Sequence, residues 1–275
     1  MSETEVAPPG VDPTIPSPAR LYDYYLGGTH NFLVDRDMSD KLQEATQGDL
    51  KDAVLANRGF HVRAASWMAR RGIRQFLDIG SGLPTQNNTH ETVQAVDPAT
   101  RVLYVDNDAM VGAYANMLLA GDGTTALVIA DLTDPDTLLA NPQLRQMLDL
   151  SAPVGVMMTA VMHFVPDERD PWGLVARYMA AVAPGSYLAL SHGTMDRMDP
   201  TAIQTGKDLY ARSTANLFMR PRAEIERFFA GLELEPPTPG SAAEITYVGL
   251  WGAEDPDLAD TDGSRSIYCA VARKP

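Results

Sequence analysis

The feature that most constrains the fold is a set of short apolar runs that alternate with helical stretches through the middle of the chain. The apolar runs are Gln75–Ile79, Arg101–Val105, Ala126–Ala130, Val154–Thr159 and Ser186–Leu190. The stretches of helical character between them are Asn88–Val96, Ala109–Ala120, Asp136–Leu148 and Pro171–Val182. Continuous apolar strands separated by helices are typical of a parallel sheet that is covered on both faces. We therefore predict an α/β fold of the doubly wound type.

The end of the chain follows a different pattern. We expect a helix at Arg222–Ala230 and strands at Leu232–Leu234 and Ser266–Ala272, with no crossover helix between the two strands. The loop between these strands is rich in proline, glycine and aspartate, and it has room for one short strand at Ile245–Leu250. Two late strands without a crossover predict an antiparallel hairpin at the edge of the sheet.

The N-terminal part has its own organisation. Residues 1–18 contain five prolines and no periodic apolar face, so we predict a flexible arm there. Residues 19–73 are expected to form a helical cap, because apolar side chains recur at helical spacing over Leu50–Met68 and Gly72 suits the end of a helix. Residues 74–275 would then form the core, and the chain is predicted to make one domain overall.

Charge and cysteine content limit the partners. The net charge of −14 would repel nucleic acid and anionic membranes, so we predict a small-molecule substrate and neither of those partners. Cys269 is the single cysteine, which excludes an intramolecular disulfide and a cysteine zinc site. The acidic cluster within 254–262 lacks the spacing of metal ligands, so no metal is predicted. An acidic N-terminus and the lack of a long apolar run predict a cytoplasmic protein.

Three of the predicted strands end in an aspartate, namely Asp78, Asp106 and Asp131. In open α/β sheets the carboxyl ends of the strands form the ligand-binding edge. A carboxylate after the second strand can accept hydrogen bonds from both ribose hydroxyls, and one after the third can accept from the exocyclic amine of adenine. Gly80 and Gly82 let the backbone approach a ligand closely. The pattern predicts a pocket for an adenosine group.

The loop around Gly80 indicates which adenosine cofactor would bind. A dinucleotide-binding loop would have a third glycine at the position of Thr85, and Asp78 would repel the anionic pyrophosphate. A ligand with a positively charged ammonium group fits this loop better. S-adenosylmethionine carries an ammonium and a sulfonium, so it is the predicted cofactor, and a nicotinamide dinucleotide is the less favoured alternative.

Motifs along the chain resemble those of a known enzyme group. Residues 76–82, 104–108 and 129–132 look like successive motifs of the class I S-adenosylmethionine-dependent methyltransferases. The segments similar to a bacterial S-adenosyl methyltransferase family, formerly grouped as a domain of unknown function, are residues 18–24, 26–28, 31–32, 35–36, 82–85, 88–91 and 163–167. The similarity extends from Ser17 to Lys274. It implies a Rossmann-like, seven-stranded, mostly parallel sheet with an antiparallel last strand, plus a helical N-terminal extension.

The resemblance also implies positions around the cofactor. The residues expected there are Asp78, Gly80, Ser81 and Gly82 at the methionine part, Asp106 and Asn107 at the ribose, Asp131 and Leu132 at the adenine, and Ala160, Val161 and His163 near the transferable methyl group. Pro84 stands where class I enzymes commonly have a third glycine. The bacterial family shares this feature, so the departure does not argue against cofactor binding.

Two histidines and an aromatic segment allow more than one interpretation. His163 could be a general base near the methyl group, or a buried histidine bonded to a carbonyl. His192 could also line the substrate pocket. A lid over cofactor and substrate, or alternatively a simple cover for the sheet, would be formed by Tyr22, Tyr25, Asn31 and Phe32.

Four polar residues of the cap also have two interpretations each. Arg20 and Arg58 could bind a substrate carboxylate, although exposed arginines usually have no such role. Asn57 and His61 lie on the apolar stripe of their helix, so they need partners either in the functional site or in the backbone.

The predicted function is S-adenosylmethionine-dependent methyl transfer to a small-molecule acceptor through an O or N atom. Many methyl transfers need only proximity and alignment, so a general base is not required. The main alternative is a non-catalytic module that binds S-adenosylmethionine or S-adenosylhomocysteine, because binding motifs are visible in a sequence and acceptor chemistry is not. A nicotinamide-dependent oxidoreductase is less favoured. The sequence leaves the acceptor and the oligomeric state open.

Overall fold

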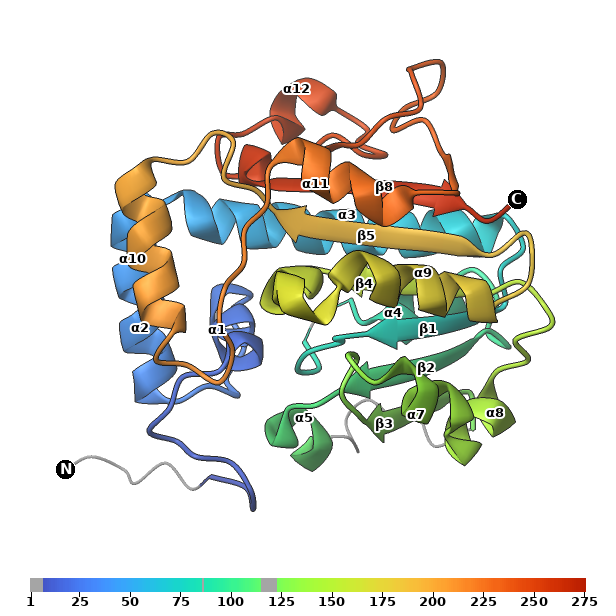
Figure 1. Ribbon diagram of the computed structural model, residues 1–275, viewed down its shortest axis with the longest axis horizontal. Coiled ribbons are helices and arrows are strands. Elements are labelled where there is room, and N and C mark those ends of the chain that lie inside the picture. Colours follow the sequence, from blue (N-terminus) through green and yellow to red (C-terminus); the bar gives the residue numbers. More distant parts are fainter. Residues whose placement is uncertain (1–6, 86, 115–122) are drawn as a thin grey trace.

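A mixed eight-stranded sheet forms the centre of the molecule in the computed structural model, which describes residues 7–85, 87–114 and 123–275 (Figure 1). The strand order is β3-β2-β1-β4-β5-β8-β6, and β7 also pairs with β8. The strands are β1 (Gln75–Ile79), β2 (Arg101–Asp106), β3 (Thr125–Ile129), β4 (Gly155–Thr159), β5 (Tyr187–Gly193), β6 (Glu233–Leu234), β7 (Thr246–Tyr247) and β8 (Ile267–Arg273). The first five pair in parallel, and β8 runs antiparallel to β5. The predicted Rossmann-like, mostly parallel sheet with an antiparallel last strand is confirmed.

The edge beyond β8 explains why the sheet has eight strands where seven were expected. Ala272 and Arg273 of β8 pair with β6, whereas Tyr268 and Cys269 pair with β7. Two short strands therefore share one edge of β8 at different points along its length. The antiparallel pairing predicted for the end of the chain is confirmed, and the short strand expected within Ile245–Leu250 is two residues long.

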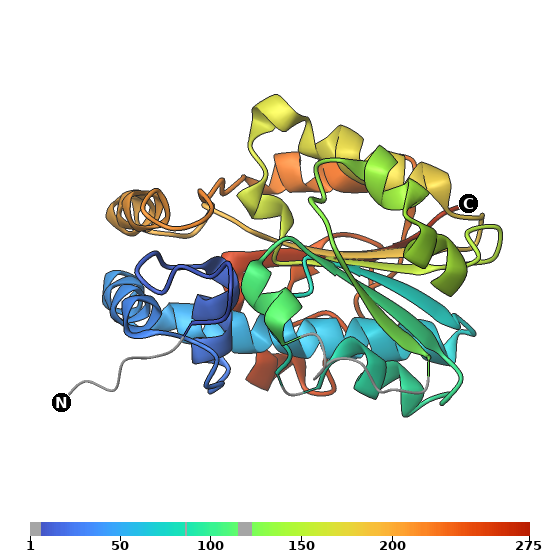
Figure 2. The ribbon, with the colours of Figure 1, turned by 90° about the horizontal axis from the view of Figure 1, so that it is seen from below.

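Helices cover both faces of the sheet, as the continuous apolar runs predict. Leu77 and Leu103 face one layer and Phe76 and Val102 face the other, because successive side chains of a strand point to opposite sides. The layer on the first face contains α7 (Pro135–Ala140), α8 (Pro142–Met147), α9 (Pro171–Ala181) and α11 (Arg222–Glu226). The opposite layer contains α3 (Asp49–Arg70) and α4 (Thr89–Gln94), and Figure 2 shows the two layers on either side of the sheet.

Some helices differ from the sequence prediction in length. The stretch Asp136–Leu148 is divided into α7 and α8 because Pro142 begins a new helix whose first backbone N–H groups bond to the side chain of Asn141. Of the helix expected at Ala109–Ala120, α5 covers Ala109–Ala113, and residues 115–122 lie outside the described residues. The helix predicted to reach Ala230 ends as α11 at Glu226 and continues as a 3₁₀ turn.

A group of helices stands at the carboxyl ends of the parallel strands (Figure 1). It consists of α1 (Pro18–Tyr25), α2 (Leu33–Ala45), the start of α3, and α10 (Pro200–Tyr210). Its small core, which we call the cap cluster, is made of Leu21, Tyr25, Met38, Leu42 and Val54. No strong apolar periodicity marks α10 in the sequence, because Ala202 and Gly206 are its only buried residues. Among the described residues, no helix combines the length and the apolar character needed to cross a membrane.

Candidate functional site

A cavity of about 930 Å³ lies between the carboxyl ends of the parallel strands and the helical cap. Pockets that bind small molecules usually measure ~300–1,000 Å³, so this one has room for a cofactor together with a second ligand. All the residues predicted to surround the cofactor line this cavity, namely Asp78, Gly80, Ser81, Gly82, Asp106, Asn107, Asp131, Leu132, Ala160, Val161 and His163. The fold therefore brings the predicted cofactor site together in one place.

Asp78 is the most deeply buried carboxylate at the strand ends. Its Oδ2 accepts a 2.5 Å hydrogen bond from the hydroxyl of Thr89, and its Oδ1 has no partner among the described residues. Burial raises the pKa of Asp78 to about 6, against the opposing effects of the Thr89 bond and the positive charge of Arg58. A buried carboxylate with one free oxygen in a cavity is suited to a cationic ligand.

A chain of hydrogen bonds holds Asp78 in place from α3. The Nε2 atom of His61 lies 2.7 Å from the Thr89 hydroxyl, and its Nδ1 lies 2.9 Å from the hydroxyl of Thr159. Burial lowers the pKa of His61 to about 3, so the ring is neutral. Because Thr89 gives its hydrogen to Asp78, His61 must donate from Nε2 and accept at Nδ1. The polar residue that faced inward on the apolar stripe thus reaches the functional site.

The glycine loop after β1 is shaped for close approach of a ligand. Gly80 has a φ of 73°, and a Cβ atom there would lie 2.3 Å from Cγ2 of Val161. The N–H of Gly82 donates to Asp106 at 2.8 Å. Between the two glycines, the buried hydroxyl oxygen of Ser81 has no hydrogen-bond partner among the described residues. Buried polar atoms are normally paired, so this one is free for a ligand in the cavity.

Asp106 organises the ends of β1 and β2 together. One carboxylate oxygen accepts the N–H of Gly82 and the other accepts the N–H of Asp108 at 2.9 Å. Each oxygen keeps a second lone pair with which it can accept a hydroxyl hydrogen. Asp131, after β3, is exposed and accepts the N–H of Thr133 at 2.8 Å. Asp108, which the prediction omitted, also lines the cavity and bonds to the hydroxyl of Ser17.

The end of β4 has an unusual backbone. Ala160 has a φ of 54°, a left-handed conformation that side chains other than glycine rarely adopt. Its N–H donates to Oγ of Ser191 at 2.9 Å, and Ser191 in turn donates to Asn57 at 2.5 Å. Asn57 donates to the hydroxyl of Tyr22 at 2.9 Å. This second inward-facing polar residue of α3 therefore connects α1 to the strand ends.

The two predicted site histidines have different positions. His163 lines the cavity, and its Nδ1 accepts the N–H of Gly193 at 3.1 Å. His192 is completely buried on the opposite face of β5, where it stacks on Phe228 and accepts a 2.8 Å hydrogen bond from Arg220. The placement of His192 in the substrate pocket was therefore wrong, because alternation along the strand turns its side chain away from the cavity.

The four residues considered for a lid or a cover differ in their positions. Tyr22 and Tyr25 line the cavity, whereas Asn31 and Phe32 do not. Asn31 is buried and donates to the carboxylate of Asp23 at 2.8 Å. Phe32 is buried beneath the guanidinium of Arg20, and its N–H bonds to Asp35. Both residues support the wall of the cavity from behind.

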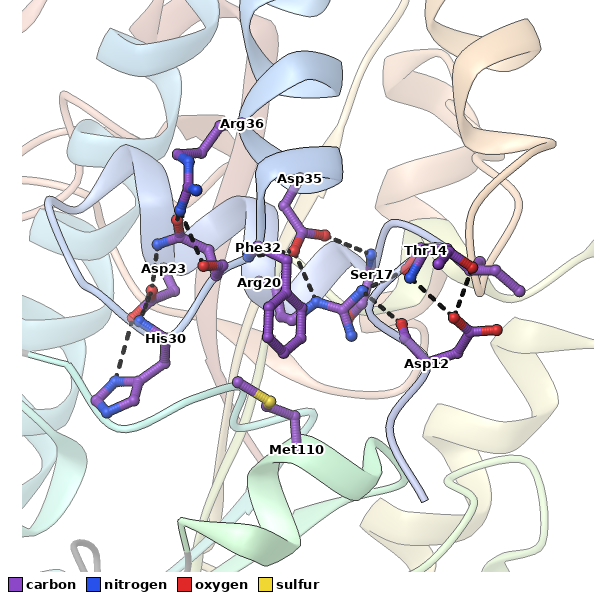
Figure 3. A network of polar contacts seen from close by, with 12 residues as sticks. Asp12, Thr14, Ser17, Arg20, Asp23, His30, Phe32, Asp35, Arg36 and Met110 are labelled. Atoms are coloured by element: carbon purple, nitrogen blue, oxygen red, sulfur yellow. Dashed lines mark hydrogen bonds and ion pairs between the residues drawn. The ribbon is translucent and has the colours of Figure 1, made fainter. Parts of the chain in front are cut away.

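Figure 3 shows the ion pair at the centre of this wall. Nε of Arg20 lies 2.8 Å from Asp35, and both side chains are almost fully buried. Asp35 also accepts the N–H of Ser17 at 3.0 Å. Arg20 is among the residues that line the cavity, but its guanidinium is committed to Asp35 and to backbone oxygens, which favours the interpretation without a substrate carboxylate. Arg58 also lines the cavity, where it donates to the Thr85 hydroxyl at 2.8 Å.

The segment before α1 closes one side of the cavity. Gly10, Val11, Asp12 and Ile15 line it, and Pro16 accepts the N–H of Thr214 from beyond α10 at 2.9 Å. This segment has no helix or strand, consistent with its prolines, but it contacts the cap, the segment after α10 and Asp108. Its proline-rich composition gave no sign of these long-range contacts.

The donor set fits S-adenosylmethionine better than a dinucleotide. Asp78 offers a free oxygen to an ammonium group, and Asp106 has lone pairs available for ribose hydroxyls. The orphaned Ser81 hydroxyl lies between them along the glycine loop. No group of three or more histidine, cysteine or acidic side chains among the described residues is arranged to hold a metal ion.

Comparisons with known proteins agree with this geometry. The sequence model of a family described as S-adenosyl methyltransferase matches residues 4–275. The solved structure of a DUF574 family protein from Streptomyces avermitilis is 41% identical with a TM-score of 0.87, and the match covers 95% of this chain and 98% of that protein. A candidate methyltransferase from Thermobifida fusca is 37% identical with a TM-score of 0.87, covering 98% and 99% respectively.

A more distant structure shares the fold alone. An O-methyltransferase family protein from Burkholderia thailandensis is 14% identical with a TM-score of 0.50, and the match covers 86% of this chain and 62% of that protein. No curated protein sequence matches the chain.

Proposed function

Since the chain belongs to the S-adenosyl methyltransferase family and its cofactor is S-adenosylmethionine, we propose that it transfers the cofactor's methyl group to an O or N atom of a small molecule bound in the same cavity. The observation that carries this proposal is the single cavity lined both by the carboxylates at the strand ends and by the apolar residues of the cap. The part of the cavity at the strand ends is suited to a cation that carries hydroxyl groups, and the part beneath the cap is suited to an apolar molecule.

Different residues of the chain would bind different parts of the cofactor. Asp78 would accept the ammonium through its free Oδ1, and the loop of Gly80, Ser81 and Gly82 would contact the methionine carboxylate. Asp106 would accept from the ribose hydroxyls. The adenine would lie near Asp131 and Leu132, which leaves the methyl end facing Ala160, Val161 and His163. The cofactor itself supplies the activated methyl group.

Charge supports a small molecule as the partner. The net charge of −14 disfavours nucleic acid and anionic membranes, and the acceptor is enclosed between the strand ends and the cap in this proposal. A cytoplasmic location is part of the same proposal.

Calorimetry on the full chain tests cofactor binding at these residues. Wild-type protein should bind S-adenosylmethionine and S-adenosylhomocysteine, and Asp106→Asn should weaken both by about tenfold or more because hydrogen bonds to a charged acceptor are lost. Asp257→Asn is the matched control, since Asp257 is exposed on α12 (Pro256–Ala259) outside the cavity. Equal affinities in the two variants would remove Asp106 from the site.

A turnover assay distinguishes an enzyme from a non-catalytic binding module. Formation of S-adenosylhomocysteine with a panel of hydroxylated and aminated small molecules should identify at least one acceptor. Tight binding of both cofactor forms without turnover on any member of the panel would instead favour a non-catalytic module.

A further inference from the structure

We propose that the acceptor is an apolar ring compound that reacts through an acidic hydroxyl, of the phenol or enol type, and that His163 donates a hydrogen bond from Nε2 to the reacting oxyanion. This inference rests on the proposed methyl transfer and adds to it the class of acceptor and a residue that selects it. Three observations carry it: the lining of the cap side of the cavity, the hydrogen bonds of His163, and the commitments of the other groups that could take a proton.

The cap side of the cavity is apolar and partly aromatic. Its lining includes Leu42, Leu50, Val54, Phe164, Ile203 and Tyr210. The rings of Phe164 and Tyr210 lie 5.7 Å apart. Side chains of this kind bind a flat apolar molecule by burying its faces.

Most of the charged groups on this side are paired or located at the mouth. Arg20 is bonded to Asp35. Asp23 accepts two hydrogen bonds through Oδ2, whereas its buried Oδ1 has no hydrogen-bond partner among the described residues and lies 3.9 Å from Nδ1 of His30. Exposed side chains mark the mouth of the cavity at Arg197, Asp199 and Asp262. Asp49 and Arg58 are half-buried, and Arg58 bonds to the loop after β1. The apolar interior therefore favours an acceptor whose polar group is at one end.

His163 can donate into the cavity but is poorly placed to remove a proton. Its Nδ1 accepts the N–H of Gly193, which fixes the neutral ring with its hydrogen on Nε2. Nε2 has no partner among the described residues, and the side chain lines the cavity beside Ala160 and Val161. Burial lowers the pKa of His163 to about 3, so the ring does not take up a proton near neutral pH. The geometry favours a donor over the general base considered from the sequence.

The other groups near the methyl end that could accept a proton already have partners. His61 is the other histidine in the lining, and both its nitrogens are bonded to threonine hydroxyls. The hydroxyl of Tyr22 accepts from Asn57 and faces the carbonyl of Val54. In the proposed function, Asp78 binds the ammonium group of the cofactor. An acceptor that loses its proton to solvent needs none of these groups as a base, and its oxyanion can accept the hydrogen bond that His163 donates.

The chemical step balances without a protein base. The acceptor hydroxyl first releases its proton to water, and the Nε2–H of His163 stabilises the resulting oxyanion. The oxygen lone pair then forms the new O–CH₃ bond while the S–CH₃ bond breaks. Sulfur retains that electron pair, so the sulfonium becomes a neutral thioether and the oxyanion becomes a neutral ether.

A set of three related ring compounds, used as probes, tests the acceptor class by binding alone. The probes are 7-hydroxycoumarin, coumarin and 7-aminocoumarin, which share a ring system and differ in the reacting group. In the presence of S-adenosylhomocysteine, 7-hydroxycoumarin should bind as its anion, which its excitation spectrum identifies. Calorimetric titrations should show that it binds at least about tenfold more tightly than the other two probes. Equal binding of the three, or a preference for the amine, would overturn the proposal.

Two substitutions of His163 test its role. His163→Leu should reduce the preference for the anion to less than about twofold, and His163→Gln, which keeps an N–H donor, should retain most of it. Cooperative urea unfolding of the same samples shows whether each variant is folded. An unchanged preference in a folded Leu variant would refute the role of His163. Failure of the wild-type protein to bind S-adenosylhomocysteine would instead refute the proposed function.

Discussion

Asn57 on α3 accepts a 2.5 Å hydrogen bond from Ser191 on β5, although 134 residues separate them in the chain. Ser191 also accepts the N–H of Ala160, the residue that holds a left-handed backbone at the end of β4. Asn57 bonds on its other side to Tyr22 of α1. One buried amide thus ties the cap to the part of the cavity where the methyl group is expected.

Replacing Asn57 should therefore affect both stability and cofactor binding. Asn57→Leu leaves the buried hydroxyl of Ser191 without its acceptor, at an expected cost of about 1–3 kcal/mol in the free energy of unfolding. Freed from this support, Ala160 should position the cofactor less well, and affinity for S-adenosylhomocysteine should fall. Urea unfolding and calorimetry measure the two effects. Gln204→Leu, on the exposed face of α10, serves as a control that should change stability by less than about 0.5 kcal/mol.

The buried pair of Arg20 and Asp35 leads to a second prediction. Arg20→Met should lower the free energy of unfolding by about 3–5 kcal/mol, because it leaves a buried carboxylate without its counter-charge. The matched substitution is Arg177→Met, whose partner Asp136 is mostly exposed, so its effect should be about 0–1 kcal/mol. Similar losses in the two variants would mean that Asp35 is stabilised mainly by its backbone donors.

Asp78 should make the ligand-free protein less stable above about pH 6. Burial raises its pKa from 3.8 to about 6, so the folded state binds the proton more tightly than the unfolded state does. The stability from this group is fully present below pH 3.8 and is lost as the pH rises through about 6. Asp78→Asn should therefore raise the free energy of unfolding by about 1–3 kcal/mol at pH 7.5 relative to wild type, and by much less at pH 4.5.

The same substitution should weaken binding of S-adenosylmethionine, because the ammonium loses its counter-charge. Thermal unfolding at the two pH values, together with calorimetry at pH 7.5, checks both directions. Asp257→Asn again provides the control, with no change expected in either quantity. If Asp78→Asn were less stable than wild type at pH 7.5, burial of the charged Asp78 carboxylate would not be destabilising the folded protein.

Features that depend on local sequence were predictable from it. The strand ends at Asp78 and Asp106 follow from apolar runs that stop at those positions, and parallel strands must bring their carboxyl ends to one edge. The position of the His192 side chain relative to the cavity was not predictable in this way. Leu188 and Leu190 face the α9 layer, so His192 shares that face, but which face borders the cavity depends on how the cap docks.

The cap could not be assembled from the sequence for the same reason. Arg20 and Asp35 are close in the chain, yet nothing local shows that they pair, because either could have been exposed. The contacts of Pro16 with Thr214 and of Ser17 with Asp108 join segments that only tertiary packing brings together. Asn57 and His61 were the exception, since a polar residue on an apolar helical stripe already indicates a buried partner.

The glycine loop allows a comparison of two otherwise similar substitutions. Gly80 and Gly82 both have positive φ, of 73° and 66°, so alanine at either position should cost about 1–2 kcal/mol in backbone strain. Space distinguishes them: a Cβ at Gly82 would meet no atom within 4 Å, whereas a Cβ at Gly80 would lie 2.3 Å from Cγ2 and 2.6 Å from Cβ of Val161. Gly80→Ala must therefore also displace the backbone at the end of β4.

We expect Gly82→Ala to remain folded with a modest loss of stability, and Gly80→Ala to lose several times more stability and to bind S-adenosylhomocysteine at least about tenfold more weakly than Gly82→Ala. Urea unfolding and calorimetry on the two variants make the comparison. Truncating Val161 to alanine should not restore the Gly80 variant, because the clash with its Cβ persists. If the two glycine variants behaved alike, backbone strain alone would account for the loop, and the close contact between Gly80 and Val161 would have no role in shaping the cofactor site.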